Sequence, residues 1–314
     1  MRLVSDRTLG PYTLHERLSV GGMAEVFRAT ESGLDGFSRS VAIKRILPHI
    51  STSPDFVAMI HDEAKLVVQL KHGNIAQVYR LDEADGIFYI ALEYVEGTDL
   101  REIQERCHRA KDPLPIPHAC YIVASVCDGL DYAHNKRDAE GKPLGLIHRD
   151  VSPPNVMVSF EGEVKLIDFG LAKANTASTE TGRGILKGKL AYLSPEQARG
   201  ETIDARSDVF STGIVLYETL TGCRLFIGEN DLDTLGRVRA CEFPRASSLN
   251  RKIPWRLEKI IQRSLESDPD RRYSSADELG EALKWFMHTA GLPTRREALG
   301  MWMQENMRSK TPTS

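Results

Sequence analysis

Cysteine is scarce in this sequence, and the few that occur predict neither cross-links nor a zinc site. The five cysteines are odd in number, and no two of them have the Cys-x-x-Cys spacing of a metal or redox motif. The N-terminus lacks the apolar core of a signal peptide, and the best apolar run, residues 87–95, is interrupted by Glu93 and is too short to span a bilayer. These absences predict a reducing, cytoplasmic location and no membrane partner.

An excess of either charge is absent as well. Lysine and arginine number 41 and aspartate and glutamate 44, so the formal net charge is −3. Such a chain has no long-range field that would attract nucleic acid, and we expect no nucleic-acid partner. Its 314 residues show no repeat or low-complexity tract, and with 41% hydrophobic content they can bury the core of one large domain or two lobes.

A short hairpin is the most informative stretch of the sequence. Apolar runs at 156–159 and 164–167 flank residues 160–163, a pattern that predicts two strands joined by a tight turn. Asp150 and Asn155 precede the first strand and Asp168 follows the second, so the hairpin would bring two carboxylates and an amide oxygen together. Such oxygen ligands suit Mg²⁺. The alternative is a surface hairpin with solvated acids at its ends.

These residues belong to motifs that resemble the catalytic loop and metal-binding turn of eukaryotic-like (Hanks-type) bacterial serine/threonine protein kinases. The motifs are His148-Arg149-Asp150, Asn155 and Asp168-Phe169-Gly170. The resemblance implies an α+β, bilobal protein-kinase-like fold, with a β-rich N-lobe that contains one key helix and a mainly helical C-lobe. We expect an N-terminal extension at 1–11, the N-lobe at 12–95, the C-lobe at 96–290, and a C-terminal helix and tail at 291–314.

A glycine turn near the N-terminus is the candidate phosphate-binding loop. Ser19, Val20, Gly21 and Gly22 lie between strand-like segments at 12–19 and 25–29. Residues without a Cβ let backbone N–H groups approach phosphate oxygens closely. Only the middle glycine of the family's glycine-rich pattern is present, so an ordinary hairpin turn explains this loop about as well.

Lys44 ends an apolar strand, and the following helix supplies a candidate partner for it. Ser53 and Pro54 begin that helix, and Glu63 falls on its apolar face. Because a carboxylate that faces a core needs a partner, we expect Glu63 to pair with Lys44. In the family this pair holds the lysine on the ATP phosphates. The alternatives are a solvated Lys44 and a surface pairing of Glu63 on its own helix.

The adenine site is expected from the resemblance to the kinase hinge. Backbone groups of Glu93 and Val95 would bind the adenine edge, and Val26, Ala42 and Met157 match the positions that sandwich the ring. Ordinary core packing explains these three side chains equally well.

The resemblance also implies the catalytic roles. Asp150 would be the base that accepts or orients the proton of the attacking hydroxyl, while Asn155 and Asp168 would hold two Mg²⁺ ions. Together with Lys44, these ions would neutralise the phosphates of ATP, so catalysis would consist mainly of positioning and electrostatics.

Two departures from the family pattern coincide in this chain. Ser152 occupies the position at which most members have a lysine that contacts the γ-phosphate, and Lys189 occupies that of a threonine near the catalytic aspartate. We hypothesise that Lys189 replaces the missing lysine and delivers its ammonium near Asp150, which its long flexible stem makes feasible. The alternative is that Lys189 is a solvated loop charge.

Arg149 implies regulation by phosphorylation, because in the family this arginine pairs with a phosphorylated activation-loop residue. The candidates are Thr176, Ser178, Thr179 and Thr181. An unphosphorylated polar loop is the alternative.

Further matches predict structural contacts. Arg272 would pair with Glu196, and Asp208 would bind backbone amides of the catalytic loop. Ser274 with Asp277 would cap a late helix, and a helix at 294–306 would pack on the lobe or on a partner. Residues 135–145 form a polar insertion with no assigned role.

The sequence thus predicts a protein kinase that uses ATP and Mg²⁺ to phosphorylate serine and threonine of protein substrates, regulated through its activation loop. Self-association for autophosphorylation in trans is left open. The alternative is a pseudokinase scaffold, favoured by the eroded glycine loop and by Ser152, whereas the presence of Lys44, Asp150 and Asp168 argues against it. A small-molecule phosphotransferase is a third possibility, which the segment 194–196 and Arg272 disfavour.

Overall fold

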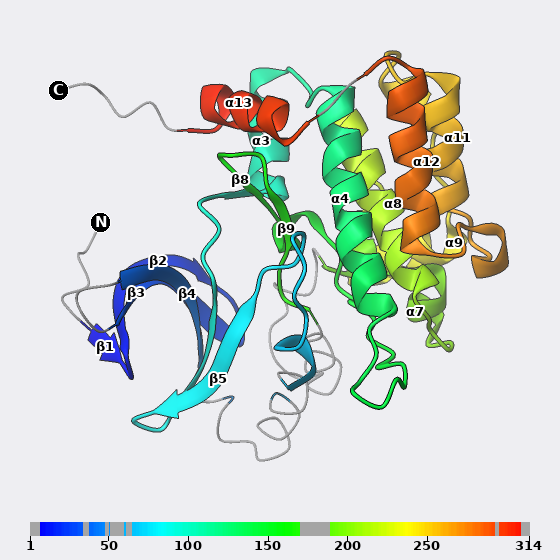
Figure 1. Cartoon of the computed structure of the whole chain (residues 1–314). Helices are drawn as coiled ribbons and strands as arrows, with labels where there is room; N and C mark the ends of the chain where they lie inside the picture. The colour runs from blue at the N-terminus through cyan, green and yellow to red at the C-terminus, as the bar shows by residue number, and fades with distance from the viewer. Residues whose placement is uncertain are drawn as a thin grey trace. The chain divides into compact units, whose positions relative to one another are not determined.

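The structure is a computed structural model that describes residues 7–33, 38–47, 50, 60, 65–169, 189–292 and 295–308. Within these ranges the chain forms two compact units, an N-terminal unit that ends at Tyr94 and a C-terminal unit that starts at Val95 (Figure 1). No helix in the described part of the chain is both long and apolar enough to cross a bilayer.

The N-terminal unit is built on one antiparallel sheet of six strands, in the order β1-β2-β3-β4-β6-β5. The strands are β1 (Arg7–Leu9), β2 (Tyr12–Val20), β3 (Ala24–Ser32), β4 (Ser38–Ile46), β5 (Val78–Ala84) and β6 (Ile87–Glu93). β1 lies in the segment predicted as an N-terminal extension and pairs with β2. The turn between β5 and β6 is tight, since Asp85 and Gly86 both have positive φ.

One face of this sheet packs in a buried apolar cluster, and the other face carries Val26 and Lys44. Phe27, Val41 and Ile43 belong to a fully buried cluster with the edge-to-face pair Tyr12 and Tyr89. Residues directly opposite in an antiparallel ladder share a face and neighbours along a strand alternate. The register Val26↔Lys44 therefore places both of these side chains on the face away from that cluster.

The C-terminal unit is mainly helical. Its helices are α3 (Leu100–Ala110), α4 (Ile116–His134), α7 (Pro195–Arg199), α8 (Arg206–Thr221), α9 (Asp231–Ala240), α10 (Ala246–Leu249), α11 (Trp255–Ser264), α12 (Ala276–Thr289) and α13 (Arg296–Asn306). α8 is the central helix, because every residue from 207 to 220 is buried and it packs against α4, α11 and α12 (Figure 1). A helix that is buried on all sides in this way is typical of a core position.

A small sheet in this unit carries the candidate site. β8 (Val156–Ser159) and β9 (Val164–Leu166) form the predicted hairpin, and β7 (Gly97–Asp99) pairs with the outer edge of β8. Asp99 then begins α3 by accepting a hydrogen bond from the amide of Glu102 at 2.9 Å. Asp99 is therefore both the last residue of β7 and the N-cap of α3.

The predicted cap of α12 is wrong by one residue. Ser275 is the N-cap, and its hydroxyl accepts a hydrogen bond from the amide of Glu278 at 3.1 Å. Ser274 lies before the cap, where its amide and hydroxyl both donate to the carboxylate of Glu278. Glu278 therefore serves both serines, and Asp277 is not the partner.

The insertion at 135–145 is a compact polar loop closed by its own backbone. Arg137 and Pro143 form an isolated antiparallel bridge, and the carboxylate of Asp138 accepts hydrogen bonds from the amides of Glu140 and Lys142 at 3.1 and 2.8 Å. The loop satisfies its polar groups locally, and no contact in it suggests a role.

Candidate active site

A buried carboxylate fixes the backbone of the loop that contains Asp150. Asp208, which has no exposed surface, accepts hydrogen bonds from the backbone amides of His148 and Arg149, each at 2.8 Å. The imidazole of His134, at the end of α4, lies 2.8 Å from the same carboxylate. The predicted contact of Asp208 with the catalytic-loop amides is therefore confirmed, and α8 holds this loop through its backbone.

The hydrogen bonds keep Asp208 ionised in spite of its burial. Burial alone would raise the pKa of this carboxyl group. The hydrogen bond with His134, the electrostatic effects of His134 and His148, and the backbone amide of His148 together lower the pKa below its ordinary value. A carboxylate that accepts two backbone N–H groups fixes the loop more firmly than a neutral acceptor would.

The ring of His148 connects the Asp150 loop to the segment that contains Asp168. His148 is fully buried, and its Nε2 lies 3.1 Å from the carbonyl oxygen of Ile167. Its Nδ1 lies 3.3 Å from the amide nitrogen of Asp150, and the edge of the ring packs on Phe169 with the ring centres 4.4 Å apart. One side chain thereby joins both ends of the predicted site.

Asn155 orients the carboxylate of Asp150. Its side-chain nitrogen donates to the carbonyl oxygen of Asp150 at 2.7 Å and to the carboxylate oxygen Oδ2 at 3.0 Å. The amide of Ile167 donates to the backbone oxygen of Asn155 at 3.0 Å, so Asp168 follows directly after this contact. The structure thus connects Asp150, Asn155 and the strand end that precedes Asp168.

Two residues of the site have a backbone conformation that non-glycine residues rarely adopt. Arg149 has φ 65° and Asp168 has φ 61°. A left-handed conformation at a non-glycine residue costs about 1–3 kcal/mol, so the surrounding contacts must maintain it. The hydrogen bonds to Asp208 account for how the conformation at Arg149 is maintained.

Lys189 lies beside Asp150. Its Nζ is 2.5 Å from Oδ2 of Asp150, and its side chain is 44% exposed against 12% for the aspartate. Ser152, at the position of the usual lysine, is buried and directs its hydroxyl to the backbone oxygen of Asp150 at 3.4 Å. The ammonium of Lys189 therefore has the location that was hypothesised, and its role stays a prediction.

A second ion pair supports the segment after Lys189. The guanidinium of Arg272 donates to both carboxylate oxygens of Glu196 at 2.7 Å, and the hydroxyl of Ser207 donates to Oε1 of Glu196 at 2.7 Å. Burial works to raise the pKa of Glu196, but the hydrogen bonds from Arg272 and Ser207 lower it to about 2. The predicted pairing of Glu196 with Arg272 is confirmed.

The remaining candidates are divided between the two units. In the N-terminal unit Ser19 and Val20 end β2, and Gly21 and Gly22 lie in the turn to β3; all four are exposed. The amide of Gly21 closes the turn by donating to Ala24 O at 2.8 Å.

The adenine candidates of this unit lie on its sheet. Val26 is on β3, Ala42 and Lys44 are on β4, and Glu93 ends β6. Val95 and Met157 belong to the C-terminal unit. Glu63 and the helix start at Ser53 lie outside the described residues, as do Thr176, Ser178, Thr179 and Thr181.

Two residues that organise the site were not predicted from the sequence, His134 and His148. His148 was noted only as part of a motif, and His134 was given no role. A buried carboxylate such as Asp208 requires hydrogen-bond donors, so its prediction as a loop anchor could have prompted a search for a basic partner at the end of a buried helix.

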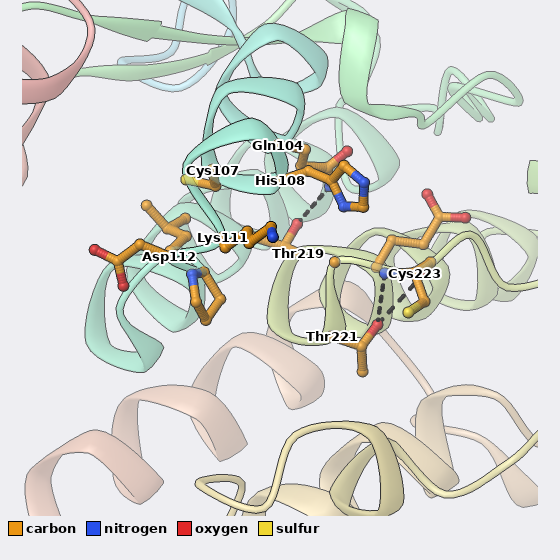
Figure 2. Close-up of a pocket in the computed structure, with 12 residues that line it drawn as sticks. Gln104, Cys107, His108, Lys111, Asp112, Thr219, Thr221 and Cys223 are labelled. Atoms are coloured by element: carbon orange, nitrogen blue, oxygen red, sulfur yellow. Dashed lines mark hydrogen bonds between the residues drawn. The ribbon is translucent and has the colours of Figure 1, made fainter.

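A separate pocket lies away from the candidate catalytic residues. It has a volume of about 370 Å³ and lies between the end of α3, the loop at 111–114 and the end of α8 (Figure 2). Gln104 donates across it to the hydroxyl of Thr219 at 2.9 Å. None of the predicted site residues lines this pocket, so it has no part in the site described above.

A curled β-rich unit, a helical unit and a loop that carries an aspartate, an asparagine and a second aspartate define the class of a protein kinase. Comparison with known families agrees, since the protein kinase domain family matches residues 12–286. The chain belongs to the protein kinase family. The predicted fold class, with a β-rich N-lobe and a mainly helical C-lobe, is confirmed by the match to solved kinase domains.

The chain is similar to several bacterial kinases. It is 40% identical to the tyrosine-protein kinase MasK of Myxococcus xanthus, over 97% of this chain and 48% of MasK. It is 34% identical to the serine/threonine-protein kinase PrkC of Bacillus subtilis, over 90% of this chain and 41% of PrkC. It therefore spans about half, or less, of the length of these relatives.

Solved structures give the same result. The PknI kinase domain of Mycobacterium tuberculosis matches with a TM-score of 0.67 and 27% identity, over 92% of this chain and 100% of that domain.

Proposed function

We propose that the chain is a protein kinase that uses ATP and Mg²⁺ to phosphorylate serine and threonine residues of protein substrates. The single observation that supports this most is the placement of the Asp150 carboxylate, which contacts both the amide of Asn155 and the ammonium of Lys189. A carboxylate that accepts the proton of a substrate hydroxyl must be held in place and must be accessible to the substrate. Asp150 is held by its neighbours and is not fully buried.

The residues present fit a magnesium site. The side-chain nitrogen of Asn155 donates to Asp150. The side-chain oxygen Oδ1 of Asn155 is therefore the atom that remains for a cation. Asn155 and Asp168 would hold Mg²⁺, whose hard oxygen ligands are usually one or two protein groups completed by phosphate oxygens and waters. Bound Mg²⁺ would neutralise negative charge on the phosphates.

In the proposed reaction, Asp150 accepts or orients the proton of the substrate hydroxyl. The hydroxyl oxygen forms a bond to the γ-phosphorus while the bond to the bridging oxygen of ADP breaks, so ADP leaves with the electron pair. Lys44, held by Glu63, would bind the α- and β-phosphates, and the backbone of residues 19–22 would cover them. Backbone groups of Glu93 and Val95 would bind adenine between Val26, Ala42 and Met157.

Lys189 would supply the cation that Ser152 cannot. A hydroxyl cannot neutralise a phosphate charge, whereas an ammonium 2.5 Å from Asp150 lies beside the oxygen that handles the substrate proton. Lys189 would then compensate for the serine at 152. The absence of a lysine at 152 would therefore be compatible with catalytic activity.

The choice between hydroxyl classes rests on the relatives and on two motifs. PrkC is named a serine/threonine-protein kinase, whereas MasK is named a tyrosine-protein kinase. Pro153 and the segment 194–196 resemble the serine/threonine branch, so we favour serine and threonine. The name of MasK makes tyrosine the second candidate.

One assay tests these proposals together. The wild type and Asp150→Asn are incubated with Mg-ATP, alone and with a generic protein substrate, and the phosphorylated residues are identified. The proposal expects phosphoserine or phosphothreonine from the wild type and at least about 100-fold less from Asp150→Asn. Phosphotyrosine alone would favour the second candidate, and binding of Mg-ATP without any transfer would establish the pseudokinase alternative.

The same product tests the regulatory proposal. Arg149 would bind a phosphate on the activation segment, for which Thr176, Ser178, Thr179 and Thr181 are the candidates. Phosphosite mapping should find at least one of these residues modified, and autophosphorylation that depends on protein concentration would indicate transfer between copies.

A further inference from the structure

The hairpin that carries the metal-ligand candidates is held at its far end by a helix outside the matched domain. The kinase domain match ends at residue 286, whereas α13 spans Arg296–Asn306. In Figure 1, α13 lies over the β8 end of the small sheet. The turn between β8 and β9, residues 160–163, is the part of the hairpin that α13 contacts.

The contact between the helix and the turn is backbone against backbone. A Cβ at Gly300 would lie 2.8 Å from the carbonyl carbon of Glu161, and a Cβ at Gly162 would lie 2.0 Å from the carbonyl oxygen of Arg296. Both distances are too short for any side chain. Gly162 also has φ 83°, a conformation that favours glycine. The two glycines therefore allow an approach that no other residue pair would permit.

Polar contacts from α13 reach the other residues of the turn. Arg296 lies 3.0 Å from the carboxylate of Glu161 and 3.0 Å from that of Glu163. The side chain of Gln304 donates to the carbonyl oxygen of Phe160 at 3.0 Å. Exposed ion pairs of this kind contribute little each, but together with the glycine contact they leave no residue of the turn without a contact to α13.

The helix is itself anchored in the helical lobe, so it can act as a fixed support. Leu299 and Met303 have no exposed surface, and the ring of Trp302 lies against that of His118 with centres 6.0 Å apart. Arg106 on α3 donates to the carbonyl oxygen of Met307 at 2.6 Å. A buried apolar face of this kind holds α13 in place on the lobe.

We infer that α13 is a positioning element of the active site, which holds the turn of the β8–β9 hairpin through Gly300 and Arg296 and thereby fixes Asn155 and Asp168 at its other end. The hairpin is short, with four residues in β8 and three in β9, so it transmits a displacement of its turn to both ends. The inference rests on the proposed use of Mg²⁺, and it extends the functional kinase unit beyond residue 286.

The test compares two glycines that both lie in helices. Gly300→Leu improves helix propensity but drives a side chain into the backbone of Glu161. Gly236→Leu in α9 is the matched control, because a Cβ there meets nothing within 4 Å. Both are made in the full chain, with Arg296→Ala as a milder variant should Gly300→Leu fold poorly.

Hydrogen–deuterium exchange and Mg²⁺ dependence are then measured. In Gly300→Leu we expect faster exchange at 156–166, unchanged exchange in α12, and a Mg²⁺ concentration for half-maximal activity about tenfold higher, as for other supporting groups of metal ligands. Arg296→Ala should raise the exchange rate at 156–166 and the Mg²⁺ concentration for half-maximal activity by a smaller amount. Gly236→Leu should match the wild type in both quantities.

Two results would overturn the inference. One is exchange at 156–166 that does not differ between Gly300→Leu and Gly236→Leu, which would show that α13 does not hold the hairpin. The other is faster exchange with an unchanged Mg²⁺ requirement, which would make the contact purely structural. A wild type that transfers no phosphate would instead refute the proposed function, while the exchange comparison would still decide whether α13 holds the hairpin.

Discussion

Glu196 and Asp150 each hold a cationic side chain in the helical lobe, but in different surroundings. The guanidinium of Arg272 is fully buried against Glu196 and donates to both of its oxygens. Arg272 also donates to the carbonyl oxygens of Glu266 and Ser267, so it connects two segments. The ammonium of Lys189 meets Asp150 through one contact and is 44% exposed.

The difference separates a contact that stabilises the fold from one that is available for chemistry. A buried pair with several further hydrogen bonds has one arrangement, and loss of either partner leaves a charge that water cannot reach. A pair whose lysine is partly exposed contributes less to stability, and that lysine can exchange one oxygen partner for another. We therefore expect the first pair to govern unfolding and the second to govern turnover.

The largest effect should come from Arg272→Met. It leaves Glu196 buried without its cation, so the free energy of unfolding should fall by about 3–5 kcal/mol. Urea unfolding followed by circular dichroism measures this. Arg206→Met is the control, because its partners Asp204 and Asp270 are 54% and 84% exposed and stay hydrated without it, so the loss should be less than about 1 kcal/mol. Equal losses in the two variants would contradict the comparison.

Lys189→Met should have the opposite profile. We expect kcat to fall by about 100-fold, the size typical of removing one group that stabilises charge in the transition state. The free energy of unfolding should change by less than about 1 kcal/mol, because the side chain of Lys189 is 44% exposed and Asp150 keeps its hydrogen bond from Asn155. Steady-state phosphorylation kinetics and urea unfolding of the same sample measure both. Normal turnover in Lys189→Met would refute a role for this lysine.

A double substitution sharpens this prediction. If Lys189 replaces the lysine missing at 152, Ser152→Lys should restore activity that Lys189→Thr removes. We expect the double variant to exceed Lys189→Thr alone by at least about tenfold, or about 1.4 kcal/mol of transition-state stabilisation, and Ser152→Lys alone completes the cycle. Additive losses in the double variant would show that the two positions act independently.

The smallest effect should be the acid dependence of stability through Glu196. Its pKa is lowered from 4.5 to about 2 in the folded protein, so its contribution is complete above pH 4.5 and is lost as the pH falls toward 2. Linkage gives a loss of about 1 kcal/mol between pH 7 and pH 4. Urea unfolding across this range should show a shallower pH dependence for Glu196→Gln than for the wild type.

Local signals in the sequence predicted the hairpin and the contact between two residues of the loop before it. The hairpin at 156–166 follows from two apolar runs around a glycine turn, and Asp150 and Asn155 come together because they are five residues apart in one loop. The pairing of Glu196 with Arg272 joins residues far apart in the chain. It was predicted only because both belong to family motifs.

The errors have both local and non-local causes. The sequence contains two overlapping capping signals, Ser274 with Asp277 and Ser275 with Glu278, and both satisfy the same rule. Only the path of the preceding chain selects Ser275. β7 was not predicted because its partner β8 lies almost sixty residues later, and a three-residue edge strand has no periodicity of its own. His134 was missed because its partner Asp208 is on another helix.

The cysteines of the folded chain differ greatly in their access to solvent. Burial raises the pKa of Cys107 to about 11 and of Cys120 to about 12, and Cys127 is also fully enclosed. Burial raises the pKa of Cys241 to about 11, whereas Cys223 is exposed at the rim of the α3–α8 pocket. A thiol-reactive dye should therefore label the native protein first at Cys223, placing a fluorescent reporter in the helical lobe away from Asp150.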